Sequence, residues 1–524
     1  MNLGERATLK AGDELGQMLS HLELGEFIYE QPSVGGVEYS FKHALTQEVA
    51  YNSLLTERRR MLHERTAHAI EELYPDQLED RYGDLARHFV RGSDTAKAIH
   101  YAQLAAEQAL SRGAYPEANN LVEETLKLLD RLPDGTERLR AELRLRSHQS
   151  VLASVLYGGS SLQREAAIRR MCELGETIGE ADQFVRGLII LCNLHFVRGE
   201  CTRGLELARR CLALAEETRD PGLLADAHYI MDILAYSCGR SREAVSHCDQ
   251  AAFHASSANR SVSLVGFLYN TSIACTQALA LQLLGRLSDA AKLVEEGLRN
   301  ARASRHLYSV GLALVIGAHL CRERREPERA LSYAEQAIAL ARENGFANWD
   351  TRGRFERGWA LTELGQHHEG IIEMEKGIAD MGQIGGAPYQ QFRIAVLAHT
   401  YIKTGRTEEA LTKLNAALQH IERTGDTVNK AEILRLQGEM FLILDNRAIN
   451  QAENCFRSGL QVARQREAKW WELRTIVSLA RLLRETNRRG EAHTMLGEIY
   501  NWFTEGFDLP DLKDAKTLLD ELRS

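Results

Sequence analysis

The sequence predicts an all-α fold in which helix hairpins stack into a solenoid, a superhelix of repeats. A chain of 524 residues is long for one compact core, so several domains or an extended repeat array are expected. Apolar residues make up 44% of the chain and only 8 residues are Pro, which fits a mostly helical protein. The 40 Gly exceed what helix interiors favour, so many of them are expected at turns.

A period of about forty residues runs through most of the chain. Turns separated by 40 to 46 positions are expected at Gly159, Gly199, Gly239, Gly285, Arg325, Gly365, Gly405, Asp445 and Asn487. From Gly199 onward, small residues recur 7 positions before, 5 after and 12 after each turn; Asp232 departs from this pattern, and the Asp445 unit needs two extra residues. Small side chains allow close approach of helices, so the period predicts helix–turn–helix units that bury their faces against neighbouring units.

This spacing of small residues around each turn resembles the tetratricopeptide repeat. The period here exceeds the ~34 residues typical of that repeat, which implies helices about one turn longer. The resemblance implies a tetratricopeptide-like solenoid with repeats over residues 136–505, after a helical arm with irregular helix pairs over residues 59–135. Residues 506–524 are expected to form a C-terminal capping helix.

The segment "WFTEGFDLPDLKDAKTLLDEL" carries the expected cap. Pro510 is expected to begin its amphipathic helix. Trp502, Phe503 and Phe507 are expected to cover the exposed face of the last repeat.

The N-terminal segment contains two aromatic and β-branched runs, "EFIYEQ" and "VEYSFKH", around "PSVGG", which predicts a β-hairpin. The stretch "FIYEQPSVGGVEYSFKHALTQEVAYNSLL" resembles the end of the winged-helix subdomain that closes a STAND-type ATPase. With the C-terminal segment, it is similar to bacterial signalling regulators in which a class III adenylate/guanylate cyclase or a DNA-binding effector precedes the ATPase module and a tetratricopeptide tail. The resemblance implies a winged-helix remnant over residues 1–58 and a chain that corresponds to the C-terminal half of such a regulator.

The catalytic parts of those regulators are not expected in this chain. No GxxxxGK[ST] loop occurs, so the backbone amides and the lysine that cradle ATP phosphates have no counterpart. A class III cyclase needs paired metal-binding aspartates on a sheet-rich domain, for which this helical chain has no room. We therefore expect no enzyme activity and no cofactor.

Histidine motifs suggest two further interpretations. The resemblance implies that His43, in the basic element "FKH", lies near nucleotide phosphates, which requires another chain to bring the nucleotide. The motif "HERTAH" suggests a zinc protease, but His63 and His68 are five residues apart and diverge by about 140° on a helix, whereas HExxH needs a four-residue step. No metal site is expected. The 9 Cys form no CxxC pair and are expected to be buried, reduced thiols.

Charge and hydropathy limit the partners. A net charge of −9 and a pI near 6.1 argue against binding to nucleic acid or to an anionic membrane, since both favour a basic surface. The most apolar windows, "GLIILCNLHFV" and "VGLALVIGAHL", are too short to span a bilayer, and the N-terminal stretch lacks a secretory signal. We expect a cytoplasmic protein whose partners are proteins or small molecules.

In a tetratricopeptide superhelix the first helix of each pair lines the concave groove, so the resemblance points to positions ten, six, three and two before each turn. Aromatic and cationic side chains at these positions suit capture of a peptide segment or an acidic group. The candidate groove residues are Asn193, Phe196, Tyr229, Tyr236, His319, Arg322, Trp359, His399, Lys403, Arg481 and Arg484.

Three functional hypotheses follow. The preferred one is a non-catalytic interaction or sensor module of a bacterial signalling regulator. It would bind a protein, peptide or effector in the groove and pass a shift of the superhelix to a cyclase/ATPase or transcription-regulator chain. The second is a small-molecule receptor that holds an inducer, as in related transcriptional activators; a pocket closed by aromatic side chains favours it over an open groove. The third is a truncated reading frame with no independent role.

Overall fold

The computed structural model describes residues 3–33, 36–384, 388–445 and 447–523. Contacts divide the chain into two compact units: unit 1 comprises residues 1–110 and 114–149, and unit 2 comprises residues 111–113 and 150–524. The later boundary falls inside helix α8, Thr136–Leu156. The four-part division expected from the sequence stays a prediction. None of the described helices is long and apolar enough to cross a membrane.

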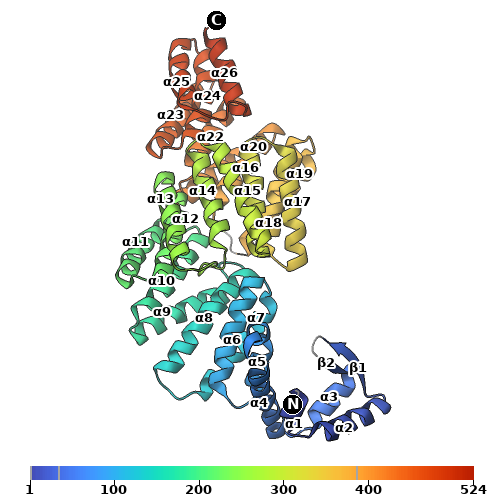
Figure 1. The fold of residues 1–524 in the computed structure, drawn as a ribbon. Helices are drawn as coiled ribbons and strands as arrows, with labels where there is room; N and C mark the ends of the chain where they lie inside the picture. Colours follow the sequence, from blue (N-terminus) through green and yellow to red (C-terminus); the bar gives the residue numbers. More distant parts are fainter. Residues whose placement is uncertain (1–2, 34–35, 385–387, 446, 524) are drawn as a thin grey trace. The chain divides into compact units, whose positions relative to one another are not determined.

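Unit 1 begins with short helices around a β-hairpin (Figure 1). The two strands pair in antiparallel fashion with Ile28 opposite Phe41, so the predicted hairpin is confirmed. The elements are α1 (Leu3–Thr8), α2 (Gly12–Leu24), β1 (Ile28–Ser33), β2 (Gly36–Phe41) and α3 (Ala44–Ser53).

This N-terminal segment buries little apolar surface. Helices α1, α2 and α3 contain no buried residue, and Ile28 of β1 is buried. Because burial of apolar surface is the main stabilising term in folding, the segment contributes little stability of its own. Its exposed large apolar residues include Leu22, Leu24, Phe27, Tyr29, Tyr39, Phe41, Leu45, Val49 and Leu55.

The remainder of unit 1 is helical and has a small core. The rings of Phe89 and Tyr101 stack with their centroids 5.5 Å apart. The Tyr101 hydroxyl donates to Glu71 Oε1 at 2.7 Å, and Lys97 Nζ donates to Glu71 Oε2 at 2.6 Å. Helices α4 (Thr56–Leu73), α5 (Tyr82–Arg91), α6 (Thr95–Arg112) and α7 (Tyr115–Leu126) precede α8, with short 3-10 turns at Pro75–Gln77, Glu79–Arg81 and Leu129–Arg131.

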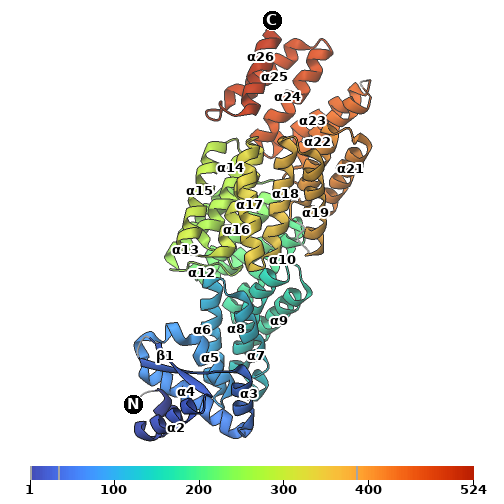
Figure 2. The same ribbon diagram turned by 90° about the vertical axis from the view of Figure 1, so that its right-hand side faces the viewer.

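Unit 2 is a stack of helix hairpins. Figure 2 shows successive hairpins side by side from α12 to α19. The even-numbered helices from α10 to α24 contact one another, and the odd-numbered helices lie outside them. The helices are α9 (Leu162–Ile178), α10 (Ala181–Val197), α11 (Cys201–Thr218), α12 (Pro221–Ser237), α13 (Ser241–Ser257), α14 (Tyr269–Leu283), α15 (Leu287–Ala303), α16 (Leu307–Glu323), α17 (Pro327–Asn344), α18 (Ala347–Glu363), α19 (His367–Gln383), α20 (Gln390–Lys403), α21 (Thr407–Thr424), α22 (Lys430–Leu444), α23 (Ile449–Gln465), α24 (Lys469–Glu485), α25 (Arg489–Trp502) and α26 (Pro510–Arg523).

The turns expected from the forty-residue period reverse the chain as predicted. Asp445 is extended instead, with φ −147°, at the unit that needed two extra residues. At the first turn the left-handed residue is Gly158 rather than Gly159. Glycine tolerates the left-handed conformation because it has no Cβ. The turn residues with φ between 59° and 88° are Gly199, Gly239, Gly285, Arg325, Gly365, Gly405 and Asn487.

Small residues around the turns allow the two helices of a hairpin to touch. In the α18–α19 hairpin, Gly358 and Gly370 face each other, and a Cβ on Gly358 would lie 2.6 Å from the carbonyl oxygen of Gly370. The matching alanines Ala278, Ala318 and Ala398 are fully buried. The predicted role of these positions in close helix packing is therefore confirmed.

Distant parts of unit 2 meet along the superhelix. Thr427 donates its backbone N–H to the Ser237 carbonyl at 3.0 Å and its hydroxyl to the Cys238 carbonyl at 2.9 Å, across 189 residues. The Ser288 N–H donates to Glu505 Oε1 at 3.1 Å, across 217 residues. The superhelix thus returns onto itself after about five repeats.

The C-terminal end begins its last helix as predicted. Helix α26 starts at Pro510 and buries Leu512, Leu518 and Leu522. Phe503 is also buried, whereas Trp502 and Phe507 are each 45% exposed. The Phe507 ring lies 5.6 Å from that of Tyr500 on α25, and the Trp502 ring lies 5.1 Å from that of Phe503, measured between centroids. Trp502 and Phe507 therefore cover the last repeat only in part.

Candidate functional site

Three cavities follow one another along the inner face of unit 2. The aromatic cavity has a volume of about 120 Å³, the central cavity about 40 Å³ and the charged basin about 360 Å³. Arg352 and Tyr389 line both the aromatic and the central cavity. Arg322 and Phe392 line both the central cavity and the charged basin. The three cavities therefore adjoin one another, and together they are named the candidate ligand-binding channel.

The aromatic cavity is walled by rings from four inner helices and from the segment before α14. Tyr308 lies 5.1 Å from Trp349 and 5.2 Å from Phe267, measured between ring centroids. Tyr229 and Tyr308 are almost fully buried. The residues that line this cavity include Asn193, Phe196, Tyr229, Phe267, Cys275, Tyr308, Leu312, Ile316, Asn348, Trp349, Arg352 and Tyr389.

Tyr389 separates the aromatic cavity from the central cavity. Its ring lies 5.9 Å from that of Phe196 and 5.7 Å from that of Tyr236. Its backbone is in the left-handed region at φ 59°, which a non-glycine residue adopts at a cost. Its N–H donates to Asp426 Oδ2, between α21 and α22, at 3.2 Å, and its hydroxyl lies 3.4 Å from the Ser237 hydroxyl at the end of α12, so partners from other repeats hold Tyr389 in place.

The central cavity holds a fixed network around Arg322. Its Nε donates to Glu356 Oε2 at 2.9 Å and its Nη2 donates to His319 Nδ1 at 2.8 Å. The other ring nitrogen of His319 lies 3.2 Å from Gln282 Oε1, which assigns the proton to Nε2. Burial, and then the Arg322 charge, hold the His319 pKa well below its usual range, so this histidine is neutral.

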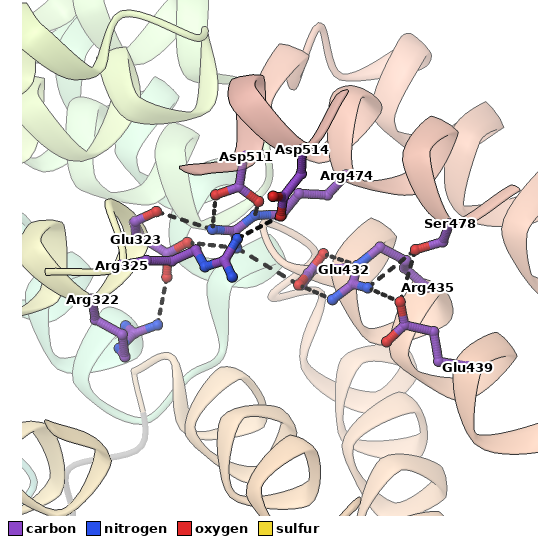
Figure 3. Close-up of polar contacts among 10 residues, drawn as sticks. All are labelled: Arg322, Glu323, Arg325, Glu432, Arg435, Glu439, Arg474, Ser478, Asp511 and Asp514. Atoms are coloured by element: carbon purple, nitrogen blue, oxygen red, sulfur yellow. Dashed lines mark hydrogen bonds and ion pairs between the residues drawn. The ribbon is translucent and has the colours of Figure 1, made fainter. Parts of the chain in front are cut away.

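The charged basin is a balanced network of ion pairs (Figure 3). Arg435 bonds Glu432 at 2.7 Å and Glu439 at 2.5 Å. Arg474 bonds Glu323 at 3.0 Å and Asp511 at 3.1 Å. Two further pairs are Arg325 with Asp514 at 2.8 Å and Lys403 with Glu363 at 2.6 Å.

The pKa shifts in the basin follow from burial and pairing. Burial lowers the pKa of Arg435, but the carboxylates of Glu432 and Glu439 outweigh it, and the net shift is upward. Burial raises the pKa of Glu323 despite two arginine partners. Burial, and then the nearby Lys403 ammonium, lower the pKa of His399 to about 3. The arginines thus stay charged and His399 stays neutral at physiological pH.

Three other arginines at the channel lack such partners. Burial lowers the pKa of Arg352, and its Nε is buried without a hydrogen-bond partner. Arg393 donates to the Pro388 carbonyl at 2.8 Å, and burial lowers its pKa to about 9. Arg164 donates to the Gly159 carbonyl at 2.6 Å and to the Asn193 side chain. Within the described ranges, none of the three arginines forms an ion pair with a carboxylate.

Ten of the eleven candidate groove residues line this channel. Arg484 is the exception, since it bonds Glu521 outside the cavities. Whether these residues bind a partner stays a prediction. Asn193, Phe196 and Tyr229 line the aromatic cavity, Tyr236, His319 and Arg322 the central cavity, and Arg322, Trp359, His399, Lys403 and Arg481 the charged basin.

Several channel residues were missed from the sequence. Arg352 and Phe392 lie 13 positions before their turns, about one helical turn beyond the ten considered, and Glu356 lies 9 before its turn, between two of the positions considered. Adding steps of three residues to positions ten and six would have found them. Phe267 comes from the segment before α14, where the step between turns is 46 rather than 40 residues, so this irregular step was the signal.

The histidine motifs of the sequence belong to unit 1. His43 is exposed at the residue preceding α3, and its nucleotide role stays a prediction. His63 Nδ1 lies 3.0 Å from His88 Nδ1, and His63 Nε2 lies 2.9 Å from the Tyr51 hydroxyl. Over the part of the chain that the structure describes, no three His, Cys, Asp or Glu side chains are placed to hold a metal ion.

Comparison with known proteins supports the fold. No family model matches the sequence. An uncharacterized protein of Rhizobium meliloti is 22% identical over 412 residues, which cover 76% of this chain and 39% of that protein. The chain thus spans well under half the length of this relative.

Two solved structures resemble the chain at low sequence identity. The Cut9–Hcn1 hetero-tetramer of the APC/C has a TM-score of 0.49 at 13% identity, covering 92% of this chain and 86% of that chain. A Rap protein complexed with competence and sporulation factor has a TM-score of 0.55 at 12% identity, covering 70% of this chain and 98% of the Rap chain. Together with the helix order, the Rap alignment shows that the chain is an all-α, tetratricopeptide-like repeat solenoid.

Proposed function

We propose that the chain is a non-catalytic sensor module that binds an effector in the channel of unit 2 and passes the change to a partner protein. The observation that carries the proposal is the candidate channel, which collects ten candidate residues from six repeats. A ligand that bridges inner helices of different repeats alters their spacing. A shift of the superhelix is therefore the natural output of binding.

The shape of the aromatic cavity supports the small-molecule form of this function. The cavity is small and closed by aromatic side chains, which favours a small effector or a single side chain over a long extended peptide. The charged basin supports the peptide form, since it is larger and its Trp359 and Arg481 suit an acidic segment. The Rap protein in the matching structure was crystallised with a factor bound, which agrees with effector binding by this kind of solenoid.

The N-terminal segment is proposed to pass the signal to the ATPase chain of a cyclase-type or transcription regulator. Its exposed Phe27, Leu45 and Val49 give an apolar face suited to such a contact. Co-purification of the chain with the regulator chain tests this step. We expect Leu45→Glu to lose the regulator chain and Ile372→Glu, on α19, to retain it. Equal retention by both variants would contradict it.

Effector binding is tested by equilibrium dialysis of the purified chain against metabolite and peptide mixtures, read by mass spectrometry. Ile316→Trp fills the junction of the aromatic and central cavities, while Ile372→Trp adds the same bulk at an exposed site on α19. We expect the parent chain and Ile372→Trp to retain the same compound and Ile316→Trp to lose it. Equal retention by all three, or measurable ATPase or cyclase activity of the purified chain, would overturn the proposal.

A further inference from the structure

We propose that the aromatic cavity binds an apolar carboxylate, a ligand with one carboxyl group and an apolar arm about the size of an amino-acid side chain. The inference rests on the proposed effector-binding function and names the chemical class of the effector. The carboxylate is placed at Arg352, where the aromatic and central cavities join. The arm is placed among the rings of the aromatic cavity.

The size and lining of the cavity define the arm. A buried cavity of about 150 Å³ lined by Leu, Ile and Phe is large enough to bind benzene. The aromatic cavity, at about 120 Å³, thus fits a ring or a short branched chain. Its walls include Phe196, Tyr229, Ile316 and Trp349, which favour apolar contact and ring stacking.

The charge of the ligand follows from Arg352. Among the described residues that line the aromatic cavity, Arg352 has the one cationic side chain, and none of the side chains is acidic. Its Nε is buried without a partner, and its guanidinium lies 5.5 Å from the centroid of the Trp349 ring. An arginine keeps its charge in proteins, and a buried charge is costly unless it is paired. A bound carboxylate supplies both the missing charge and the missing acceptor.

Neighbouring arginines strengthen the preference for an anion. Arg393 lines the adjoining central cavity, is 7% exposed and has a backbone carbonyl as its acceptor. Arg164 is 2% exposed, lies behind Asn193 at the cavity wall and also bonds neutral acceptors. Glu356 is the one acidic residue lining the central cavity among the described residues, and it already accepts from Arg322. The region is therefore cationic without its ligand.

The charged basin shows why the anion belongs at Arg352 rather than deeper in the basin. Arg435 and Arg474 each bond two carboxylates there. An incoming carboxylate at those arginines must displace an existing partner. At Arg352 no pair has to be broken, so binding gains the full charge-assisted hydrogen bond.

Two sources supply this ligand chemistry. A peptide that ends in an apolar residue presents a free α-carboxylate next to its side chain, and a free aromatic or branched-chain acid presents the same groups alone. Titration calorimetry with phenylacetate, hexanoate and a tetrapeptide ending in free Phe, each beside its neutral amide, separates the sources. Binding of the peptide alone identifies a chain end, and binding of the small acids identifies a free acid.

We expect at least one carboxylate to bind about 10- to 100-fold more tightly than its amide, the range that a charge-assisted hydrogen bond supplies. Arg352→Met should abolish this discrimination. Leu312→Trp, which fills the cavity, should abolish binding of acid and amide alike. Equal affinity of acids and amides, or no binding of any probe at millimolar concentration, would overturn the inference.

A second measurement needs no ligand. In the free protein Arg352→Met removes a half-buried guanidinium whose Nε has no hydrogen-bond partner and should raise Tm, whereas Arg435→Met leaves two carboxylates without this partner and should lower Tm. A lower Tm in both variants gives Arg352 a purely structural role and overturns the inference. If acids and amides bind equally while Ile316→Trp still blocks the effector, the charge assignment fails and the proposed sensor function stands.

Discussion

Arg474 on α24 donates hydrogen bonds to both the side chain and the backbone carbonyl of Glu323 on α16, each at 3.0 Å, across 151 residues of chain. Glu323 is almost fully buried, so this contact is not a surface ion pair. The same guanidinium bonds Asp511 at the start of α26. One arginine thus joins the middle of the solenoid, its last repeat and the capping helix.

Replacement of Arg474 tests this tie. Arg474→Met leaves Glu323 and Asp511 without their shared partner, and breaking a buried pair in this way costs about 3–5 kcal/mol. Urea unfolding of unit 2 should show the loss. In the control, Arg484→Met breaks a more exposed pair with Glu521 and should cost less than about 1 kcal/mol. Similar losses in both variants would contradict the structure.

The glycine contact in the α18–α19 hairpin predicts that Gly→Ala changes stability differently at two positions of α19. Gly370→Ala should destabilise the protein, because its Cβ would collide with the carbonyl of Gly358 and with Thr362. Gly382→Ala, on the same helix, has open space around its Cβ and should be neutral or stabilising by up to about 1 kcal/mol. Thermal unfolding of the two variants makes the comparison. A stabilised Gly370→Ala would show that the helices are farther apart.

Asp232 predicts a pH dependence of stability. Both carboxylate oxygens are buried, and burial raises the pKa to about 7, although the nearby Thr276 and Cys248 side chains oppose the shift. The unfolded value is about 4, so the folded state binds the proton more tightly. The tighter proton binding of the folded state therefore contributes fully to the free energy of unfolding below pH ~4, and this contribution is lost as the pH rises through 7. Its upper bound is about 4 kcal/mol.

Urea unfolding between pH 5 and 8 measures this effect. We expect the free energy of unfolding to fall with rising pH in the parent chain and to fall less in Asp232→Asn. Asp249→Asn, at an exposed site of α13, should keep the parent slope. An unchanged slope in Asp232→Asn would assign the pH dependence to other groups.

Hydrogen exchange should distinguish the N-terminal segment from the rest. Helices α2 and α3 bury no residue, whereas almost every residue of α12 is buried. Local opening of α2 and α3 therefore requires little loss of apolar burial. Their amides should exchange at least tenfold faster than those of α12. Equal protection in the isolated chain would mean that the segment is stabilised by contacts other than apolar burial.

The sequence was sufficient for features that recur with a period. Spacing located the turns at Gly199 and Gly365 to the residue, because a left-handed turn favours glycine and a close helix contact excludes large side chains. The same spacing placed Tyr229 and His319 on the inner face. The binding role of these side chains is not fixed by their position.

Features that depend on distant contacts could not be predicted in the same way. Tyr389 enters the channel through a left-handed backbone that Asp426 holds in place. The bond between Arg474 and Glu323 depends on how far the superhelix turns per repeat, which the period does not state. The partial exposure of Trp502 could not be predicted either, because aromatic character alone does not indicate burial.

The contacts that return the superhelix onto itself also bear on how unit 2 unfolds. An open repeat array is coupled only through nearest neighbours, so its ends can unravel while its middle stays folded. Here Thr427 is bonded to the turn after α12, and Glu505 to the start of α15. Loss of one hairpin therefore removes support from a hairpin several repeats away. Unit 2 should melt as one cooperative block, with the last repeats no less stable than the middle ones.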